Sequence, residues 1–445
     1  MHVKVALLAG VCLLASNIGA NANPIARTAP VRSSKATTWK PAAFTSASPD
    51  KVSSNVMTLT KIKSARGNKR CAAWNLFGGS TQLQALEIGE EFATEIDIAG
   101  QKFQVVVDTG SSDTWVVEKG FECVSVSNSS DVLAESACAF GPTYTSGSSF
   151  KQIPNEFFNI SYGDGEFLNG VMGTNQITLA GIEVTQEMAL VNFAGWDGDG
   201  VTSGLTGLAF PALTSAYSNS TKKQIPYNPI FTTMYEEGKV FPLFSLAILR
   251  DVSGPSGYLT LGGLPPIDFV PEFSSTPILI TNIQGYPTSF DFYTINIDGL
   301  QLNDKKLTAA GGSAIQYIVD SGTTLNFYPT EFANHVNAAF NPPAVYDSSQ
   351  GAYVVDCHAK PPKHGVTING KTFYINPLDM ILDAGTDSNG KKLCISGITD
   401  GGSSSTQDLF ILGDTFQKNV VTVFDVGAAE MRFAAREYYK SDDHY

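Results

Sequence analysis

The sequence predicts an all-β protein made of two similar β lobes with a few short helices. Glycine occurs 41 times alongside 27 Phe and 16 Tyr, a composition typical of many short strands joined by turns. Hydrophobic residues make up 43% of the chain and charged residues 16%, which allows a large core and excludes a wholly disordered chain. The length of 445 residues suits two or three units, and an internal repeat divides the body in two.

The first 22 residues (1–22) are predicted to be a secretory signal peptide. His2 and Lys4 precede an apolar run over residues 5–15, and small residues follow up to Ala22. That run is too short to span a bilayer, and no later stretch reaches the roughly 18 apolar residues that a membrane helix needs. We therefore expect a secreted, extracellular protein with no membrane partner. The alternative is that this segment is a buried N-terminal strand.

Residues 23–70 form a predicted basic propeptide. Up to residue 70 the chain holds eleven Lys and Arg but a single acid, Asp50, so this part carries +10 and the remainder −23. The dibasic pair Lys69-Arg70 ends the segment as a processing site, and the mature chain would start near Cys71. The alternative is a basic linker that stays attached. The mature chain is expected to comprise an N-terminal lobe over 71–263 and a C-terminal lobe over 264–445.

The charge and the metal-binding residue types exclude several classes of function. An acidic body disfavours nucleic acid and anionic membranes, so neither is expected as a partner. The six Cys include no CxxC spacing, and the five His form no HExxH pattern. We therefore expect no metal and no cofactor.

Strand patterns dominate the chain after Gln82. Residues 103–107 are an apolar, β-branched run, and residues 157–162 alternate before a hairpin tip at 163–165. Helical patterns are found near 230–238 and over 329–340, where Thr330 is in position to cap. Three apolar residues of the second pattern fall on one helix face: Phe332, Val336 and Phe340.

The internal repeat places one acidic loop in each half. Residues 103–112 run as an apolar strand into Asp108-Thr109-Gly110-Ser111, and residues 315–324 run 212 positions later into Asp320-Ser321-Gly322-Thr323. A second pair of similar segments, 205–210 and 411–416, follows. Two similar lobes that each present one Asp-(Thr/Ser)-Gly loop are the simplest explanation. A duplicated structural turn is the alternative.

Two such loops facing each other would make an acid–base site. Glycine allows a tight turn and a close approach, and the neighbouring hydroxyls and amides can hold the carboxylate by hydrogen bonds. Two carboxylates in contact cannot both ionise cheaply, so they share one proton. The ionised member can then take a proton from water while the other supplies one. This chemistry needs neither a metal nor a covalent nucleophile.

These segments resemble pepsin-like aspartic endopeptidases of the secreted fungal type. Residues 108–116 and 319–324 are similar to the two active-site signatures of that family, and residues 161–165 to its flap hairpin. Further similar segments are 205–211, 410–416 and 421–425. The resemblance covers about residues 82–436 in order. It implies a bilobal pepsin-like fold with an active-site cleft between the lobes.

The resemblance also implies a role for individual residues. Asp108 and Asp320 would be the catalytic dyad. Their neighbours would support the dyad: Thr109, Gly110, Ser111, Ser321, Gly322 and Thr323. A further set would bind substrate: Trp115, Tyr162, Gly163, Asp164 and Thr324. Tyr162 would lie on the flap with Trp115 bonded to its hydroxyl. The alternatives are an ordinary strand aromatic for Tyr162 and core packing for Trp115.

The cysteines suit an oxidising compartment. Cys123 with Cys138 and Cys357 with Cys394 are the simplest pairing, although four cysteines allow three, and members of the family carry bridges at these places. Cys71 then has no partner, and a free thiol, further trimming or an intermolecular bond all remain open. Sequons that fit a glycosylated protein occur at Asn128, Asn159 and Asn219, although such short motifs also arise by chance.

Taken together, these features lead us to expect a secreted, acid-active aspartic endopeptidase made as a zymogen. It would act as a monomer on polypeptides and prefer bulky apolar residues around the cleaved bond, with Lys accepted through Asp164. Lys61 or Lys63 would inhibit the dyad before activation. The alternatives are an inactive pepsin-like binding protein, which would have lost a dyad or flap residue, and a two-carboxylate glycosidase.

Overall fold

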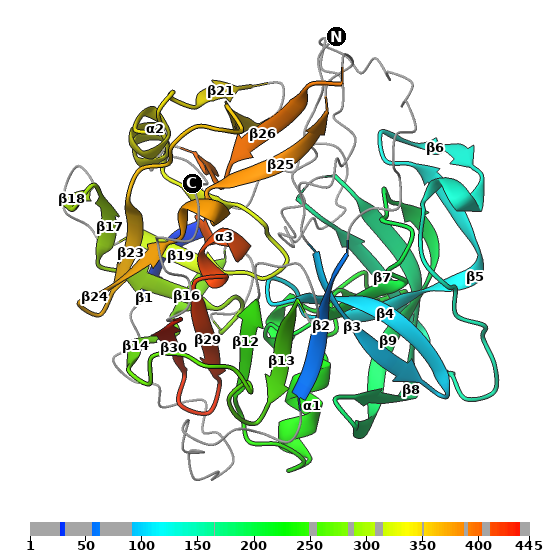
Figure 1. Ribbon diagram of the computed structural model, residues 1–445. Helices are drawn as coiled ribbons and strands as arrows, with labels where there is room; N and C mark the ends of the chain where they lie inside the picture. Colours follow the sequence, from blue (N-terminus) through cyan, green and yellow to red (C-terminus); the bar gives the residue numbers. More distant parts are fainter. Residues whose placement is uncertain are drawn as a thin grey trace.

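The computed structural model describes the lobes almost completely and the N-terminal region only in part (Figure 1). The described residues are 27–31, 56–62, 91–163, 165–248, 256–283, 289–307, 315–348, 351–386, 390–402 and 410–436. The predicted signal peptide, Lys69-Arg70, Cys71 and Asp164 lie outside these residues.

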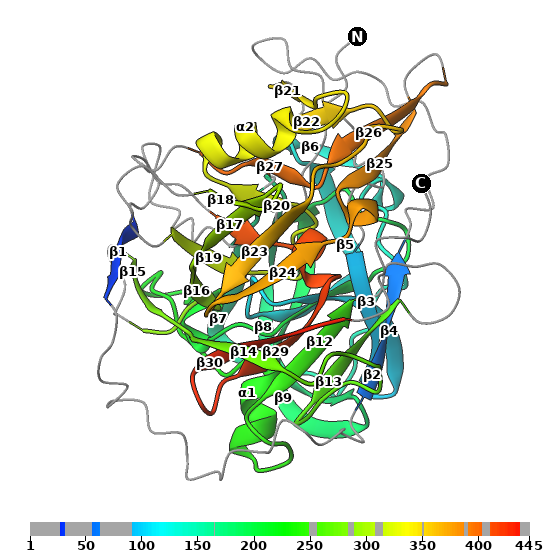
Figure 2. The same ribbon diagram turned by 60° about the vertical axis from the view of Figure 1, so that its left-hand side comes forward.

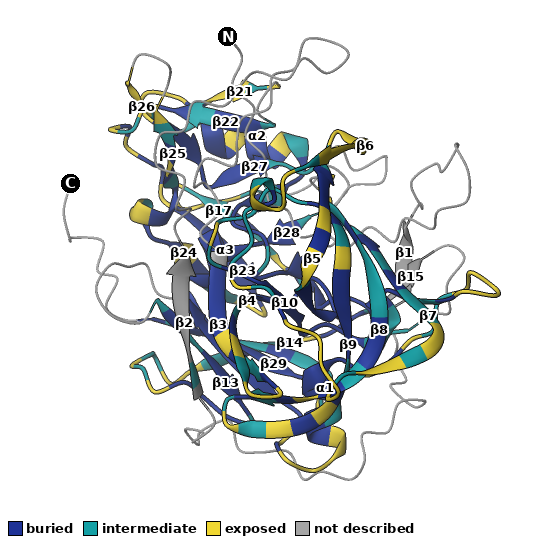
Figure 3. Ribbon diagram, turned by 90° about the vertical axis from the view of Figure 1, so that its right-hand side faces the viewer, coloured by how far each residue is buried: buried dark blue, intermediate teal, exposed yellow. Residues whose placement is uncertain are grey.

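A 15-stranded sheet builds the N-terminal lobe and continues into the centre of the molecule. Its strands in this half are β3 (Glu91–Ile98), β4 (Gln101–Asp108), β5 (Thr114–Ser125), β6 (Asn128–Leu133), β7 (Lys151–Ser161), β8 (Phe167–Leu179), β9 (Ile182–Gly195), β10 (Gly204–Gly207), β11 (Ala216–Ser218), β12 (Phe244–Ile248) and β13 (Gly257–Leu261). β5 and β9 are largely buried, whereas β6 is exposed (Figure 3). The long strands follow from dense β-branched and aromatic residues.

The second half adds three smaller sheets, and it also supplies strands to the central one. β14 (Phe273–Pro277), β29 (Val420–Asp425) and β30 (Glu430–Ala435) extend the central sheet beside β12. The others are β15 (Ile280–Ile283), β16 (Thr294–Ile297), β17 (Gly299–Leu302), β18 (Lys305–Leu307), β19 (Ile315–Val319), β20 (Asn326–Tyr328), β21 (Val345–Asp347), β22 (Ala352–Val355), β23 (His364–Ile368), β24 (Lys371–Ile375), β25 (Ile381–Thr386), β26 (Lys392–Ser396), β27 (Ile398–Asp400) and β28 (Ile411–Leu412). The predicted all-β, two-lobed fold class is confirmed.

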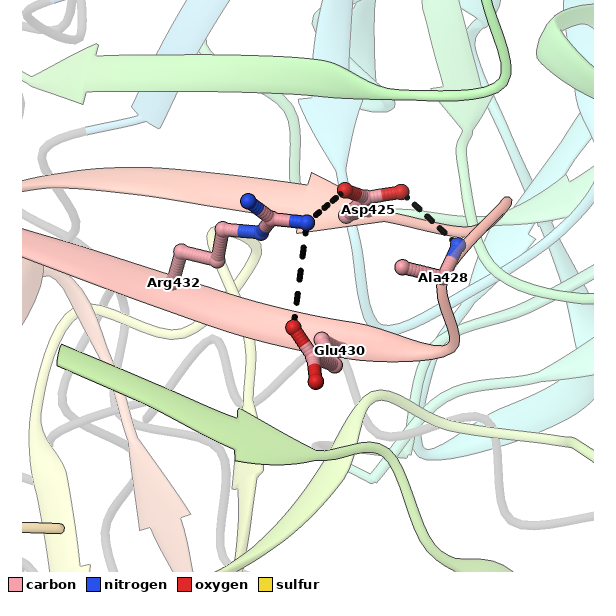
Figure 4. Close-up of polar contacts among 4 residues, drawn as sticks. All are labelled: Asp425, Ala428, Glu430 and Arg432. Carbon is pink, nitrogen blue, oxygen red and sulfur yellow. Dashed lines mark hydrogen bonds and ion pairs between the residues drawn. The ribbon is translucent and has the colours of Figure 1, made fainter. Parts of the chain in front are cut away.

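The central strands join the two lobes (Figures 1 and 2). Phe244 of β12 stacks on Phe424 of β29 with ring centroids 4.5 Å apart, and Tyr293 packs edge-on against Phe424 at 4.7 Å. Aromatic pairs of this kind add to the burial energy of a core. The turn of the β29–β30 hairpin is closed by Asp425, which accepts a hydrogen bond from the backbone N–H of Ala428 and pairs with Arg432 (Figure 4).

Part of the predicted propeptide is built into this fold. β2 (Val56–Ile62) lies in the central sheet between β3 and β13, with Thr60 opposite Ala93 and Leu59 opposite Gly257. β1 (Arg27–Val31) pairs with β15. Lys61 therefore belongs to a strand of the sheet, and Lys63 lies outside the described residues.

Both predicted helices are present, but one detail of the prediction was wrong. α1 spans Ile230–Glu236 and α2 spans Thr330–Ala338, with Phe332, Val336 and Phe340 all buried. Thr330 does not cap α2: Pro329 occupies that position, and the Thr330 hydroxyl donates to Asp400 instead. Four short helical elements were not predicted from the sequence. They are the helix α3 (Asp414–Gln417) and three single turns, Glu135–Ala137, Pro211–Leu213 and Pro377–Asp379.

Candidate active site

The two acidic loops follow equivalent strands in the two lobes. β4 ends at Asp108 and runs parallel to β10, with Asp108 opposite Gly207. β19 ends at Val319, directly before Asp320, and runs parallel to β28. Both carboxyl groups therefore follow a buried strand that is held by a second strand, and Asp108 and Asp320 are 0% and 1% exposed.

Glycine next to each aspartate lets the two carboxyl groups approach. A Cβ built on Gly110 would lie 2.5 Å from an oxygen of Asp320, and one built on Gly322 would lie 2.5 Å from an oxygen of Asp108. Any side chain at these two positions would collide with the opposite carboxyl group. The carboxyl groups are also within hydrogen-bond reach of each other.

Each carboxyl group is held by the same pair of donors from its own loop. The backbone N–H of Gly110 donates to Asp108 Oδ1 at 2.7 Å, and that of Gly322 donates to Asp320 Oδ1 at 2.8 Å. The outer oxygens accept from hydroxyl groups, Asp108 Oδ2 from Ser111 and Asp320 Oδ2 from Thr323, the latter at 2.7 Å. The inner oxygens thus face each other across the interface of the lobes.

Thr109 and Ser321 bond the two loops to one another. The backbone N–H of Ser321 donates to Thr109 Oγ1 at 2.9 Å, and the backbone N–H of Thr109 donates to Ser321 Oγ at 3.2 Å. The hydroxyls donate onward into the opposite lobe, Thr109 to the carbonyl of Val319 and Ser321 to that of Val107. This reciprocal set of four hydrogen bonds fixes the distance between the lobes at the dyad.

Burial and charge set the protonation of the pair. Burial raises the pKa of Asp108, and hydrogen bonds from Ser111, Gly110 and Asp320 oppose that rise. Burial raises the pKa of Asp320 well above its ordinary value, and the charge of Asp108 raises it further. Because two carboxyl groups this close cannot both ionise cheaply, the pair shares one proton.

The hairpin predicted around residues 157–165 is present in the structure. β7 and β8 form an antiparallel hairpin whose tip contains Gly163, and Tyr162 is buried beside it. The indole N–H of Trp115 donates to the Tyr162 hydroxyl at 2.9 Å. Asp164 is outside the described residues. Thr324 is buried in the opposite lobe, and its carbonyl accepts from the N–H and hydroxyl of Thr415.

Several residues around the site were missed by sequence reasoning. Trp196 stacks on Phe140 and packs edge-on against both Trp115 and Tyr162. Tyr293, from the C-terminal half, donates its hydroxyl to the carbonyl of Leu208, whose N–H bonds the carbonyl of Asp108. Asp113 accepts from Tyr227 within the N-terminal lobe. The sequence shows that these residues are aromatic or acidic, but no local pattern indicates which distant residues they contact.

Both predicted disulfides are present, and the three predicted glycosylation sites differ in exposure. Cys123 is bonded to Cys138 and Cys357 to Cys394, as predicted. Of the three sequons, Asn128 and Asn219 are exposed, whereas Asn159 is half-buried and pairs with Asn169 within the β7–β8 hairpin. An attached glycan is accommodated more readily at the two exposed positions.

The described part of the chain shows neither a metal site nor a membrane helix. That part contains no group of three His, Cys, Asp or Glu side chains that would hold a metal ion. None of its helices is long and apolar enough to cross a membrane.

Comparisons with known proteins agree with this geometry. The sequence model of the eukaryotic aspartyl protease family matches residues 91–436. The chain belongs to the eukaryotic aspartyl protease family. A probable aspartic-type endopeptidase of Aspergillus fumigatus is 54% identical over 404 residues, which cover 89% of this protease and 91% of the relative. The protease is thus an aspartic-type endopeptidase, and polypeptides are its substrates.

More distant relatives and a solved structure extend the comparison. Syncephapepsin of Syncephalastrum racemosum is 26% identical, with 80% of each chain covered. Mouse (Mus musculus) cathepsin E is 28% identical, with 78% of this protease and 80% of the relative covered. The crystal structure of an aspartic proteinase from Irpex lacteus matches with a TM-score of 0.60 and 19% identity, over 80% of this protease and 96% of that chain. That structural match supports the pepsin-like fold.

Proposed function

We propose that Asp108 and Asp320 are the catalytic dyad of an acid-active endopeptidase. The observation that carries this proposal is the mutual approach of two buried carboxyl groups across Gly110 and Gly322. Two carboxyl groups that close share one proton. A pair in that state holds a base and an acid at the same place, which a peptide bond needs for hydrolysis. Acid pH preserves the singly protonated state, because at high pH the shared proton is lost.

The reaction then follows from the positions of the two groups. Ionised Asp108 accepts a proton from a water molecule, whose oxygen attacks the peptide carbonyl carbon. Asp320 gives its proton to the carbonyl oxygen, so a neutral diol forms. The proton on Asp108 passes to the nitrogen, one diol hydroxyl returns a proton to Asp320, and the C–N bond breaks to release an acid and an amine. Fixed donors around the dyad reduce the reorganisation that these steps require.

The flap and the opposite loop would bind the substrate backbone. Tyr162 and the amide of Gly163 lie on the flap side, and Gly322 and Thr324 on the other. The Asp164 amide would act together with that of Gly163. The aromatic rings near the flap favour bulky apolar residues around the cleaved bond. Asp164 would pair with a Lys side chain before that bond.

Secretion as a monomeric zymogen completes the proposal. The signal-like N-terminus, two disulfides and exposed sequons favour export of the secreted fungal type. The +10 segment that ends at Arg70 and the −23 body would attract each other near neutral pH. Falling pH neutralises carboxylates but leaves Lys and Arg charged, so acid weakens this attraction.

Cleavage profiling tests the catalytic proposal. The purified protease is incubated with a mixed peptide library at several pH values, with and without a statine peptide that mimics the diol. We expect cleavage at acid pH between bulky apolar residues, with tight inhibition. Asp164→Thr should reduce cleavage after Lys far more than cleavage after Phe or Leu. An absence of cleavage at every pH would refute the proposal.

A processing variant tests the zymogen. With Lys69-Arg70 replaced by Ala-Ala, the protein should remain latent near neutral pH and convert itself on acidification, faster at higher salt because exposed charge pairs are screened. N-terminal sequence and activity are followed over time. Full activity of the uncleaved variant at neutral pH would exclude an inhibitory propeptide.

A further inference from the structure

The flap hairpin has a second attachment, at Glu166, a residue without a role in the function proposed above. Glu166 follows the hairpin tip directly before β8, and 6% of its surface is exposed. Its Oε1 accepts a hydrogen bond from the backbone N–H of Asp197 at 2.7 Å. Its backbone carbonyl accepts from the N–H of Tyr162 at 2.8 Å. Glu166 thus bonds the flap tyrosine on one side and the loop after β9 on the other.

The loop that receives Glu166 is itself firmly held. The backbone N–H of Gly198 donates to the carbonyl of Cys138 at 3.0 Å, and that of Gly200 donates to the carbonyl of Ala139 at 2.6 Å. Cys138 belongs to a disulfide. The Asp199 carboxylate accepts hydrogen bonds from two backbone N–H groups of its own loop. This loop therefore offers a firm support to which the tip of the β7–β8 hairpin can be attached.

The same loop carries an aromatic ring to the flap. The ring of Trp196 lies 5.6 Å from that of Tyr162 and 5.3 Å from that of Trp115, both edge-on. Trp115 also bonds the Tyr162 hydroxyl. The Trp196 ring and the Asp197 amide thus both contact the hairpin, so a shift of either group would change the position of Tyr162.

We propose that Glu166 is a positioning residue of the flap, whose carboxyl oxygen fastens the hairpin to the Asp197 amide and so holds Tyr162 in place before substrate binds. This inference rests on the proposed role of the flap. A flap that is already ordered loses less conformational entropy when a peptide binds, and this favours binding. The hydrogen bond needs only an acceptor oxygen, so a protonated carboxyl keeps it at acid pH.

Two substitutions separate the hydrogen bond from the charge. Glu166→Ala removes the acceptor, whereas Glu166→Gln keeps one and removes the charge. Glu183→Ala, at an exposed position of β9, is the matched control. We expect Glu166→Ala to raise KM, and to weaken binding of a statine peptide, by about ten-fold with little change in kcat. Glu166→Gln and Glu183→Ala should resemble the wild type.

Hydrogen–deuterium exchange provides a readout that needs no catalysis. Amides of residues 160–167 and of Asp197 should exchange faster in Glu166→Ala but not in Glu166→Gln, while those of β5 and β9 stay protected. The proposal is overturned if Glu166→Ala leaves KM and exchange unchanged, or if Glu166→Gln is as impaired as Glu166→Ala. Inactivity of all four proteins would count against the proposed function alone, and the exchange rates would still decide the role of Glu166.

Discussion

The two acidic loops are alike around their carboxyl groups and differ in the residues that follow. Each aspartate accepts from a glycine amide and a hydroxyl three residues on. Five residues beyond the aspartate, the N-terminal loop has buried Asp113 and the C-terminal loop has buried Leu325. The shared half holds the two carboxyl groups to which we assign the chemistry, whereas the divergent half connects each loop to a different lobe.

The divergent half gives the N-terminal lobe an acidic cluster. Asp113 accepts from the Tyr227 hydroxyl at 2.6 Å and the Ser215 amide at 2.9 Å, while among the described residues its buried Oδ2 has no hydrogen-bond partner. Burial raises the pKa of Glu187 on β9, and the negative charges of Glu156 on β7 and of Asp113 raise it further. Each of these two glutamates also has a buried oxygen without a hydrogen bond in the described structure. The C-terminal loop has an apolar residue at the matching position.

The largest expected effect should be the same in both lobes. Asp108→Asn and Asp320→Asn should each reduce kcat by about 10⁴-fold, because an amide can neither accept nor share the proton. Peptide cleavage at acid pH measures the loss, and circular dichroism checks the fold. Near-normal turnover of either variant would remove that aspartate from the dyad.

A pH dependence of stability is expected from the N-terminal lobe. Burial raises the pKa of Asp113 from 3.8 to about 6, and burial with the charge of Glu156 raises that of Glu187 to about 7. The folded protein then binds these protons more tightly than the unfolded chain does. The resulting stability is complete below about pH 4 and is lost as pH rises toward 6 and 7.

Asp113→Asn tests this dependence, since the amide oxygen still accepts from Tyr227 and Ser215. We expect the substitution to raise the free energy of unfolding at pH 7 by up to about 3 kcal/mol, with little effect at pH 4. Urea unfolding across pH measures it, with exposed Glu183→Gln as the control. An equal effect at both pH values would show that protonation of Asp113 does not control stability.

Removing a hydrogen-bonding hydroxyl between the two loops should destabilise the protein by a similar amount from either side. Thr109→Val and Ser321→Ala each leave buried backbone groups without a partner, which costs about 1–3 kcal/mol. Because both belong to one network, the double variant should lose less than the sum of the single losses. Urea unfolding at pH 4 gives the three values. Full additivity would indicate that the two hydroxyls act independently.

The smallest effect should be confined to one lobe. Trp115→Phe removes the donor to the Tyr162 hydroxyl, and we expect kcat/KM to fall by about five- to ten-fold. Phe327 occupies the matching place in the C-terminal lobe, where it packs against the hydrophobic cluster around Leu325. Phe327→Leu should therefore change kcat/KM by less than about two-fold. Equal losses in the two variants would mean that Trp115 contributes packing alone.

The sequence by itself determined the local features of this protein. The Asp-(Thr/Ser)-Gly loops and the strand before each could be predicted because turn chemistry, β propensity and repeated motifs act over a few residues. The two disulfides were predicted as the simplest of three pairings, and the flap role of Tyr162 came from the resemblance to a known family. The two main helices were readable too, although Thr330 was wrongly taken as a cap, since it bonds Asp400 from another strand.

The tertiary structure alone decided which distant groups meet. Three features join residues that are far apart in the sequence: the contacts of Asp113 with Tyr227 and Glu187, the hydrogen bond from Tyr293 to Leu208, and the position of β2 inside the central sheet. No local pattern encodes such contacts, because they depend on how whole sheets pack. The same holds for the dyad pKa values: the sequence supplied two carboxyl groups, and burial and proximity in the fold set their protonation.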